Sequence, residues 1–367
     1  MSLKSHKWRV LVLGAEFDKV KVPLYKASAR GKKTALLKTL LSSCCRMDCK
    51  YCAFRAGCRL YPREKWDIDE LVRITLDLYN KGIIDGLFLS SSMYSDPDKV
   101  VEEEIEVAEE LRRRGFKGYI HLRLMPGVSR DLIERAGIVA DRIGVNIETV
   151  NPSSFNEISP SKGDWMQDVI KRLEWCVGTW RSLRRKYKSQ KVGYLKAGID
   201  TQLIVGVVDE TDYEILKTTY YLYRSLSLKR IYFSAFVPIV STPFENKKPT
   251  PLWREYRLYQ VSELIRTYKF TLKDIESILT DEMLPNKDPK IVYAEVNRDI
   301  YPIDIETASF RELLKIPGIG FRSARKIIEI RSRKKLTIDD LIRILGYRRF
   351  KKAIQYMTLK HRTLKYS

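Results

Sequence analysis

Short apolar segments alternate with longer amphipathic segments between residues 36 and 237, and this alternation limits the fold more than any other feature of the sequence. The apolar segments are rich in β-branched residues, and the segments between them repeat apolar residues at helical spacing. Strands separated by helices pair in parallel within one sheet. The sequence therefore predicts an α/β fold whose parallel strands form an open sheet or, as we expect, a partial (β/α)6 barrel. The predicted strands cover residues 36–41, 86–92, 118–124, 142–148, 199–208 and 230–237, and the predicted helices between them cover residues 68–81, 98–114, 130–136, 165–186 and 212–225.

Three cysteines follow the first predicted strand in the order Cys45-x3-Cys49-x2-Cys52. A cubane 4Fe-4S cluster needs a ligand on every iron, and cysteine thiolates normally supply all four. Three thiolates therefore leave one iron without a protein ligand. S-adenosylmethionine, which chelates through its amino and carboxylate groups, is the usual occupant of such an iron. The spacing predicts a 4Fe-4S cluster on these three cysteines and S-adenosylmethionine as the second cofactor.

Other uses of cysteine remain open at this point. A structural zinc site needs paired Cys-x2-4-Cys elements, whereas this sequence contains one Cys-x2-Cys pair. Disulfides are not expected, because a long chain without an N-terminal apolar signal segment is typical of the reducing cytoplasm. Inert buried thiols are a further alternative. We expect Cys44, Cys58 and Cys176 to be buried small apolar residues rather than ligands.

The charge of the chain favours a polyanionic partner. Its 367 residues carry a net charge of +22, and residues 303–367 contain 17 Lys and Arg but 6 Asp and Glu. Such an excess attracts nucleic acid. A second basic run, residues 181–196, is either a phosphate-contacting segment or the solvated end of a helix. No apolar run approaches the roughly 20 residues that cross a bilayer, so we expect a cytoplasmic protein without a membrane partner.

Polar residues gather where the predicted strands end. The carboxyl ends of parallel strands meet at one edge of the sheet, which is where ligands bind in such folds. Gly206 ends the fifth strand, where a missing side chain lets backbone approach a ligand. His121 is expected to be either a core histidine or a site residue. The residues predicted to hold the cofactor are Tyr51, Ser90, Ser91, Ser92, Arg123, Asn146, Glu148 and Gly206.

The C-terminal fifth of the chain carries a second motif, Leu-Leu-Lys-Ile-Pro-Gly-Ile-Gly over residues 313–320. Pro317 ends one helix, and we expect Gly318 and Gly320 to adopt positive φ in a tight hairpin. Backbone amides of the hairpin and the next helix would then be free to meet phosphate. The motif resembles a helix-hairpin-helix DNA-binding element, and a weaker second copy begins at Thr337. A hairpin that binds protein is the alternative. The predicted DNA contacts are Gly318, Ile319, Gly320, Arg322, Arg325 and Lys326.

These features predict four segments. They are an N-terminal extension (1–34), the partial barrel (35–245), a helical connector marked by a proline cluster (246–302), and an all-α helix-hairpin-helix domain (303–367).

The cysteine motif with Tyr51 resembles the signature of the radical S-adenosylmethionine superfamily. Further segments resemble, in order, the DNA modification/repair radical S-adenosylmethionine proteins, whose genes often neighbour a uracil-DNA-glycosylase-like protein. They include Gly86-Leu-Phe-Leu-Ser-Ser, Asn146-Ile-Glu, Tyr232-Phe-Ser-Ala-Phe-Val-Pro and Pro302-Ile-Asp-Ile-Glu-Thr-Ala. Ser92 departs from the usual glycine. The resemblance implies a 5′-deoxyadenosyl radical acting on nucleic acid, an electron donor such as ferredoxin or flavodoxin, and a glycosylase-like partner.

The leading hypothesis is therefore a radical S-adenosylmethionine enzyme that modifies or repairs DNA. An enzyme that modifies tRNA or another RNA is the first alternative, although extra cluster cysteines or a separate RNA-binding domain are not evident in the sequence. A non-catalytic iron–sulfur protein that binds DNA is the second. Production of 5′-deoxyadenosine separates the two enzymes from the binding protein.

Overall fold

The computed structural model describes residues 6–13, 24–29 and 32–359, so parts of the predicted N-terminal extension and the last eight residues lie outside the described chain. The chain divides into two compact units. We call residues 1–210 with 221–251 the barrel unit, and residues 211–220 with 252–367 the helical unit. Each is described by itself.

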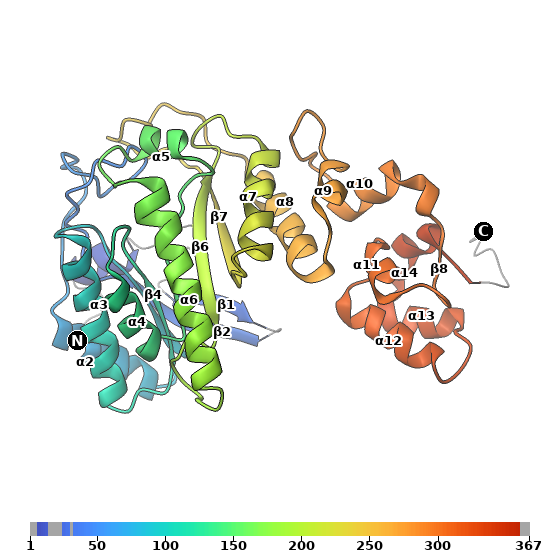
Figure 1. Ribbon diagram of the computed structural model, residues 1–367, viewed down its shortest axis with the longest axis horizontal. Coiled ribbons are helices and arrows are strands. Elements are labelled where there is room, and N and C mark those ends of the chain that lie inside the picture. The colour runs from blue at the N-terminus through green and yellow to red at the C-terminus, as the bar shows by residue number, and fades with distance from the viewer. Residues whose placement is uncertain (1–5, 14–23, 30–31, 360–367) are drawn as a thin grey trace. The chain divides into compact units, whose positions relative to one another are not determined.

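The barrel unit is built on one seven-stranded sheet in which the strands follow chain order (Figure 1). Strands β2 to β7 are all parallel, which confirms the six-stranded parallel sheet predicted from the sequence. An additional strand, β1, pairs antiparallel with β2. The strands are β1 (Leu24–Ala29), β2 (Lys32–Leu40), β3 (Gly86–Ser90), β4 (Tyr119–Arg123), β5 (Arg142–Gly144), β6 (Gly198–Val205) and β7 (Arg230–Ala235).

Helices connect the parallel strands, and α2, α3, α4 and α6 succeed one another along one face of the sheet (Figure 1). Their starts are fixed by caps: the side chains of Asp67 and Asp96 accept the backbone N–H groups of Glu70 and Lys99. The helices are α2 (Ile68–Asn80), α3 (Pro97–Arg113), α4 (Arg130–Val139), α5 (Pro152–Ile158), α6 (Lys171–Lys186), which follows a π-helical turn at Trp165–Ile170, and α7 (Asp212–Arg224).

The helical unit consists mainly of short helices around its own core, which includes Leu313, Ile316, Ile327 and Leu341. The prediction of an all-α domain over residues 303–367 is wrong. Strands β8 (Ile303–Asp304) and β9 (Met357–Thr358) form a short parallel pair that buries Ile303 and Met357. The helices are α8 (Leu252–Glu263), which continues as a π-helical turn to Tyr268, α9 (Leu272–Glu276), α10 (Pro289–Val296), α11 (Phe310–Lys315), α12 (Phe321–Arg331), α13 (Ile338–Leu345) and α14 (Tyr347–Ala353).

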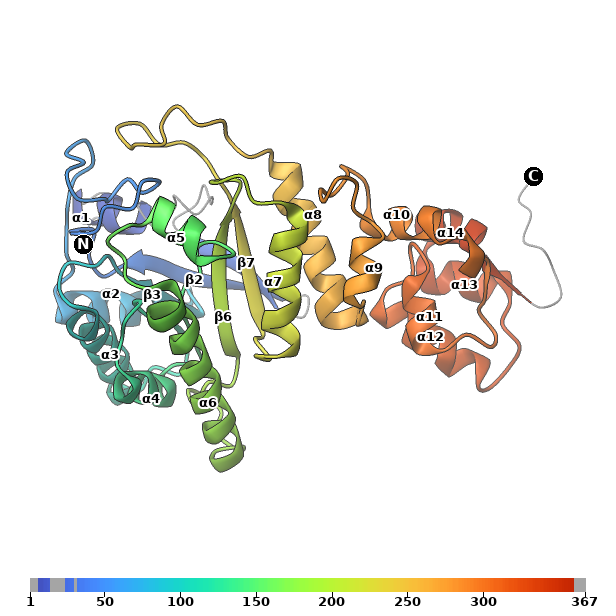
Figure 2. The same cartoon turned by 45° about the horizontal axis from the view of Figure 1, so that its top comes forward.

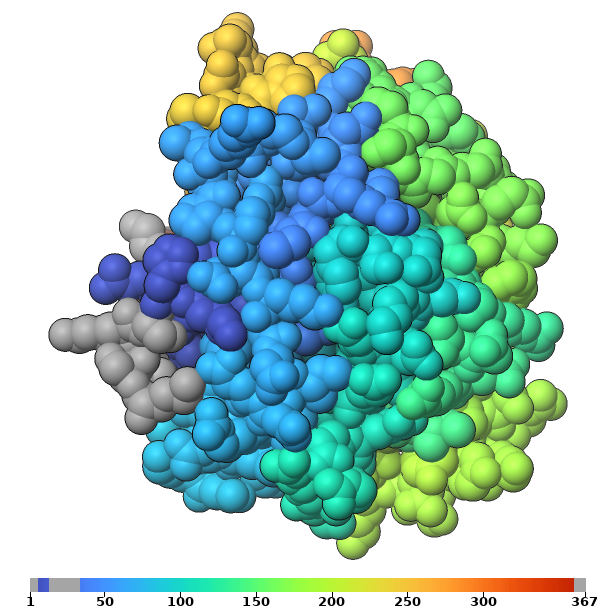
Figure 3. Space-filling model, turned by 90° about the vertical axis from the view of Figure 1, so that its left-hand side faces the viewer, coloured from blue at the N-terminus to red at the C-terminus, as the bar shows by residue number. Residues whose placement is uncertain are grey.

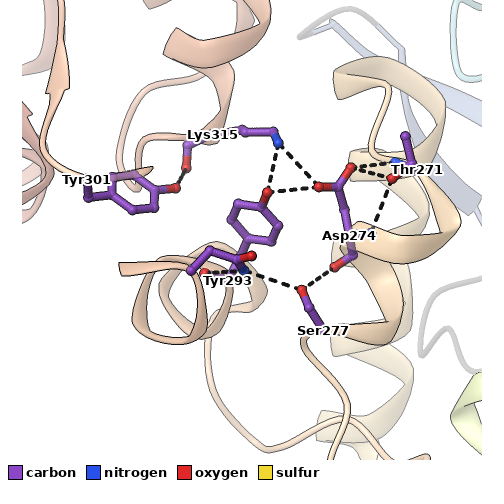
Figure 4. A network of polar contacts seen from close by, with 7 residues as sticks. Thr271, Asp274, Ser277, Tyr293, Tyr301 and Lys315 are labelled. Atoms are coloured by element: carbon purple, nitrogen blue, oxygen red, sulfur yellow. Dashed lines mark hydrogen bonds and ion pairs between the residues drawn. The ribbon is translucent and has the colours of Figure 1, made fainter. Parts of the chain in front are cut away.

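A polar network ties the connector helices α9 and α10 to α11 within the helical unit (Figure 4). Lys315 Nζ donates to the Tyr293 hydroxyl at 2.7 Å and lies 3.2 Å from Asp274 Oδ1, which also accepts from Tyr293 at 2.8 Å. The Tyr301 hydroxyl donates to the Lys315 carbonyl oxygen. Lys315 lies inside the predicted hairpin motif, yet its ammonium group is directed into this network.

Among the described residues, no helix combines the length and the apolar character that a bilayer crossing requires.

Candidate functional site

A cavity of about 450 Å³ lies in the barrel unit where the parallel strands end. Strand β2 contributes Leu40, β3 contributes Ser90, β4 contributes Arg123 and β7 contributes Ala235, each at or near the carboxyl end of its strand. The loops above the sheet in Figure 2 close over this edge. The cavity therefore lies at the position where parallel α/β sheets bind their ligands.

Cys45, Cys49 and Cys52 all line this cavity, so the structure brings the three predicted ligands together. They belong to one loop whose two ends pair with each other: the Ser43 N–H donates to the Glu64 carbonyl oxygen at 2.9 Å. Backbone N–H groups also face two of the sulfurs, from Met47 to Cys45 Sγ and from Phe54 to Cys52 Sγ, each at 3.4 Å. Such N–H groups stabilise thiolates.

Residues 236–251 flank the cysteine loop. The Tyr61 hydroxyl donates to the Val240 carbonyl oxygen at 3.5 Å, and Lys50 lies 5.9 Å from the ring centre of Phe244. Figure 3 shows the yellow surface of this segment against the blue surface of the cysteine loop. Val237 and Ile239 also line the cavity, so both segments form its walls.

Arg63 binds backbone groups of the cysteine loop, and we call this set of contacts the clasp. Its guanidinium donates to three carbonyl oxygens, those of Ser43 at 2.9 Å, Arg55 at 2.9 Å and Cys58 at 2.8 Å, and it lies 5.4 Å from the ring centre of Phe54. These acceptors come from before the first and after the last cysteine of the motif. Arg63 therefore joins the two sides of the loop.

Replacing Arg63 by methionine should loosen this loop. Three charge-assisted hydrogen bonds are lost, so we expect local stability to fall by about 2 kcal/mol and amide exchange to accelerate over residues 43–60 of the metal-free protein. Arg59→Met is the matched control, because Arg59 is exposed and makes no hydrogen bond or ion pair within the described chain. Equal exchange in both variants would contradict the clasp.

The remaining cysteines differ from the expectation in one case. Cys58 and Cys176 are buried, as predicted, but Cys44 is exposed. The prediction for Cys44 is wrong because its thiol faces the Glu64 carbonyl oxygen at the outer end of the loop, at 3.8 Å.

The donor set fits a cluster better than a single ion. Within residues 6–13, 24–29 and 32–359, no three His, Cys, Asp or Glu side chains converge on one metal position. A cubane binds each thiolate to a different iron, so its ligands surround a volume instead of meeting at a point. Burial raises the pKa of Cys49, and burial together with the neighbouring Cys49 raises the pKa of Cys52 to about 12. Metal loading must therefore displace protons from these thiols.

Three buried oxygens of the cavity lack partners. Ser91 Oγ, Ser92 Oγ and Asn146 Oδ1 are inaccessible to water and accept or donate no hydrogen bond within the described residues. Buried polar atoms without partners are costly in a folded protein. A polar ligand in the cavity would satisfy them, so these predicted residues fit a group such as S-adenosylmethionine.

Glu148 also lines the cavity and is paired with a residue that the sequence analysis missed. Its carboxylate lies 2.5 Å from Lys162 Nζ. Burial alone would lower the pKa of Lys162, but the Glu148 charge raises it. Burial and the Glu148 charge raise the pKa of Tyr51, which lines the same cavity as Glu148 and the three cysteines. Nothing local in the sequence marks Lys162, because it is brought to the cavity by the loop after α5.

Strand β5 is shorter than predicted, because it ends at Gly144 instead of Glu148. Glu148 still forms an isolated parallel bridge with Leu203 of β6, and its φ is +60°, in the left-handed region that side chains rarely adopt. Such backbone strain is concentrated at functional sites.

Arg123 lines the cavity but is already engaged below it. Its Nη1 and Nη2 lie 2.9 Å and 3.3 Å from the two carboxylate oxygens of Asp200, which is fully buried on β6. His121 Nε2 lies 3.1 Å from the same carboxylate, so His121 is a core histidine bound to a side chain. The sequence did contain a signal for this polar interior of the barrel. Asp200 and Gln202 lie at alternate positions of an otherwise apolar strand, so both side chains are on the same face of the sheet.

This cluster should make the barrel sensitive to acid. Burial lowers the pKa of His121 to about 4, below the ordinary 6.5, so the unfolded chain binds the proton first as pH falls. The free energy of unfolding should therefore decrease between pH 6.5 and pH 4. Despite its burial, Asp200 has its pKa held at about 2 by Arg123 and His121, and its contribution is lost only at lower pH. His121→Gln should flatten the decrease in denaturant titrations across that range, and an unchanged slope would contradict this assignment.

Gly206 is not among the residues that line the cavity. Gly206 is the first residue after β6 and has a φ of +75°. Its N–H donates to the Glu210 carboxylate in the same loop. The structure thus places this predicted site residue in a local turn.

The predicted hairpin residues lie together in the helical unit, in the turn between α11 and α12 and on α12. Gly318 has φ of +88°, as expected, but Gly320 has φ of −104°, so that prediction is wrong. Gly320 is needed for space instead, because a Cβ there would lie 3.3 Å from the Tyr268 hydroxyl. Arg322, Arg325 and Lys326 are exposed on α12.

One amide of this turn is not free, contrary to the expectation. The Ile319 N–H donates to the Ile316 carbonyl oxygen at 3.1 Å. The carbonyl oxygen of Ile319 accepts from Lys290 Nζ at 2.7 Å. A connector residue distant in sequence thus occupies a group that the motif alone leaves open.

The basic run of residues 181–196 begins at the end of α6, where Arg184, Arg185 and Lys186 form the last helical turn. Positive charge there complements the helix dipole, so the solvated helix end accounts for these three residues.

Residues 39–182 match a known family, the Radical SAM superfamily. This segment therefore forms a radical S-adenosylmethionine domain, as its cysteine motif predicts, and supports an enzymatic role. Proteins of this superfamily use a 4Fe-4S cluster and S-adenosylmethionine. No curated protein matches the chain.

Solved structures share the fold. The FeFe-hydrogenase maturase HydG from Carboxydothermus hydrogenoformans is 14% identical with a TM-score of 0.50; the match covers 71% of this chain and 56% of HydG. A second HydG structure is 12% identical (TM-score 0.49, 86% and 80% covered), and methylornithine synthase PylB is 16% identical (TM-score 0.48, 64% of each chain). The chain thus spans little more than half the length of the first of these proteins, and the likeness concerns the fold alone.

Proposed function

We propose that this protein is a radical S-adenosylmethionine enzyme that modifies or repairs DNA. The observation that carries the enzymatic part is the convergence of Cys45, Cys49 and Cys52 on one cavity beside buried oxygens that lack partners. Cys45, Cys49 and Cys52 hold the 4Fe-4S cluster, and Ser91, Ser92 and Asn146 bind polar groups of S-adenosylmethionine. The bound cofactors supply reductive cleavage of S-adenosylmethionine, which gives a 5′-deoxyadenosyl radical.

The residues of this chain shape and shield the reaction. Arg63 keeps the cysteine loop in place, and the Glu148–Lys162 pair carries complementary charge next to Tyr51. Val237 and Ile239 contribute apolar walls that limit water in the cavity. An electron must come from a donor such as ferredoxin or flavodoxin.

DNA as the substrate is supported by the charge of the chain and by the helical unit. Exposed arginines and lysines on α12 attract phosphate irrespective of sequence. The site lies in a cavity of the barrel unit instead of on an open surface, so the target nucleotide would have to be single-stranded or flipped out. A glycosylase-like partner fits this role.

The enzymatic part is tested with anaerobically reconstituted protein, S-adenosylmethionine and dithionite. We expect 5′-deoxyadenosine and methionine to be released. A spectrum of tetrahedral zinc, or a cluster without any release, would contradict the proposal and leave a binding protein.

The choice of polymer is tested by binding to duplex DNA, single-stranded DNA and tRNA across a salt series. We expect DNA to bind more tightly than tRNA at each salt concentration. Preference for tRNA would transfer the chemistry to RNA.

A further inference from the structure

Helix α14 is the element that lies beside the α11–α12 turn. A Cβ placed on Gly318 would lie 2.9 Å from the Arg349 carbonyl oxygen and 3.5 Å from the Ala353 Cβ. The two segments therefore present adjacent surfaces. From Gly346 to Leu359 the chain contains four basic residues and no acidic one.

The charges of α14 are mostly unpaired. Arg348, Arg349 and Lys351 are exposed, and none of them forms an ion pair with another residue in the described part of the chain. Lys352 differs, because it lies 2.7 Å from Asp288. Exposed cations without carboxylate neighbours keep their attraction for phosphate.

A second basic run in the same unit gives a comparison. Arg333 lies 3.1 Å from Glu329, and Lys334 lies 2.8 Å from Asp340. These carboxylates neutralise part of the run at residues 333–335. Two of the three basic residues at 333–335 are therefore paired with carboxylates, whereas Arg348, Arg349 and Lys351 are not paired within the described residues.

The turn offers fewer backbone donors than its motif indicates. The Ile319 amide is already engaged, and an anion would have to break that hydrogen bond first. Side-chain cations next to the turn carry no such cost. They also act without reading sequence.

We infer that Arg348, Arg349 and Lys351 of α14 form a second phosphate-contacting surface of the helical unit, in addition to the cations of α12, and that this surface binds the DNA backbone. The inference rests on the proposed function and deepens it. It extends the DNA contact from α12 and the turn to the side chains of α14.

The test compares two double variants of the full-length protein that remove the same charge: Arg348→Gln with Arg349→Gln, and Arg333→Gln with Lys335→Gln. Affinity for a short DNA duplex is measured from low to moderate salt. The α14 variant should bind roughly tenfold more weakly, and its salt slope should fall by about 0.9 per lost contact. The control should change little. Equal weakening in both variants, or none in the first, would overturn the assignment.

Circular dichroism verifies that each variant is folded. A wild-type protein that binds no nucleic acid at any salt concentration would contradict the proposed function itself, independently of which helix is altered.

Discussion

Replacing Cys49 by serine is expected to abolish release of 5′-deoxyadenosine. Cys49 is the most buried of the three cysteines that line the cavity, at 6% exposure. No fourth cysteine of the described chain lines the cavity, so none can replace it. Even partners that only support a metal ligand cost 10–100-fold when removed, so loss of a ligand should reduce the rate by more than about a hundredfold. Iron content and the visible absorbance of the reconstituted protein should fall with it.

Cys44→Ser is the matched control for this prediction. Cys44 adjoins Cys45 in sequence, but its thiol is exposed and does not line the cavity. We expect normal iron content and normal release of 5′-deoxyadenosine. If Cys44→Ser lost the cluster while Cys49→Ser retained it, the ligand set proposed for this protein would be wrong.

Replacing Gly144 by alanine should destabilise the barrel unit by about 3 kcal/mol or more. The added Cβ would clash with the Asp200 carboxylate and carbonyl oxygens and lie 2.7 Å from Arg123 Nη1. The carboxylate and the guanidinium form a buried ion pair, which cannot shift without breaking, and the carbonyl oxygen belongs to the backbone of β6. Overpacking costs about 1–3 kcal/mol, and disruption of a buried pair costs about 3–5 kcal/mol. Denaturant unfolding of the metal-free protein measures the change.

Gly178 provides the control for Gly144. It lies on the exposed side of α6, and a Cβ there meets no atom within 4 Å. Gly178→Ala should therefore stabilise the protein by about 0.5–1 kcal/mol through helix propensity. Destabilisation of similar size at both positions would mean that the Arg123–Asp200 pair is not the cause.

The sequence predicted the parallel strands well because their hydrophobic runs are local signals. Strand β3 and helix α2 agree with prediction within about two residues. Strand β1, which pairs antiparallel with β2, was missed because its sequence contains no hydrophobic run that would predict a strand. Strand β5 was predicted to be longer because Val145 and Ile147 continue its apolar pattern past Gly144, where the strand ends.

The candidate site divides in the same way. Cysteine spacing identified Cys45, Cys49 and Cys52, since their chemistry depends on residues a few positions apart. Lys162 and Arg63 were missed because each reaches its partners only after folding. The hairpin shows the opposite error, because its motif indicates a free Ile319 amide, whereas this amide donates to the Ile316 carbonyl oxygen.

The clasp made by Arg63 has a consequence for the life of the protein. Iron–sulfur centres are destroyed by oxygen, and many small metal domains unfold when their metal leaves. Here the ends of the segment between Ser43 and Glu64 are joined by peptide hydrogen bonds and by one guanidinium, none of which requires inorganic atoms. We therefore expect the metal-free polypeptide to keep the two ends of this segment joined, so that a new cluster can be assembled on it after oxidative loss.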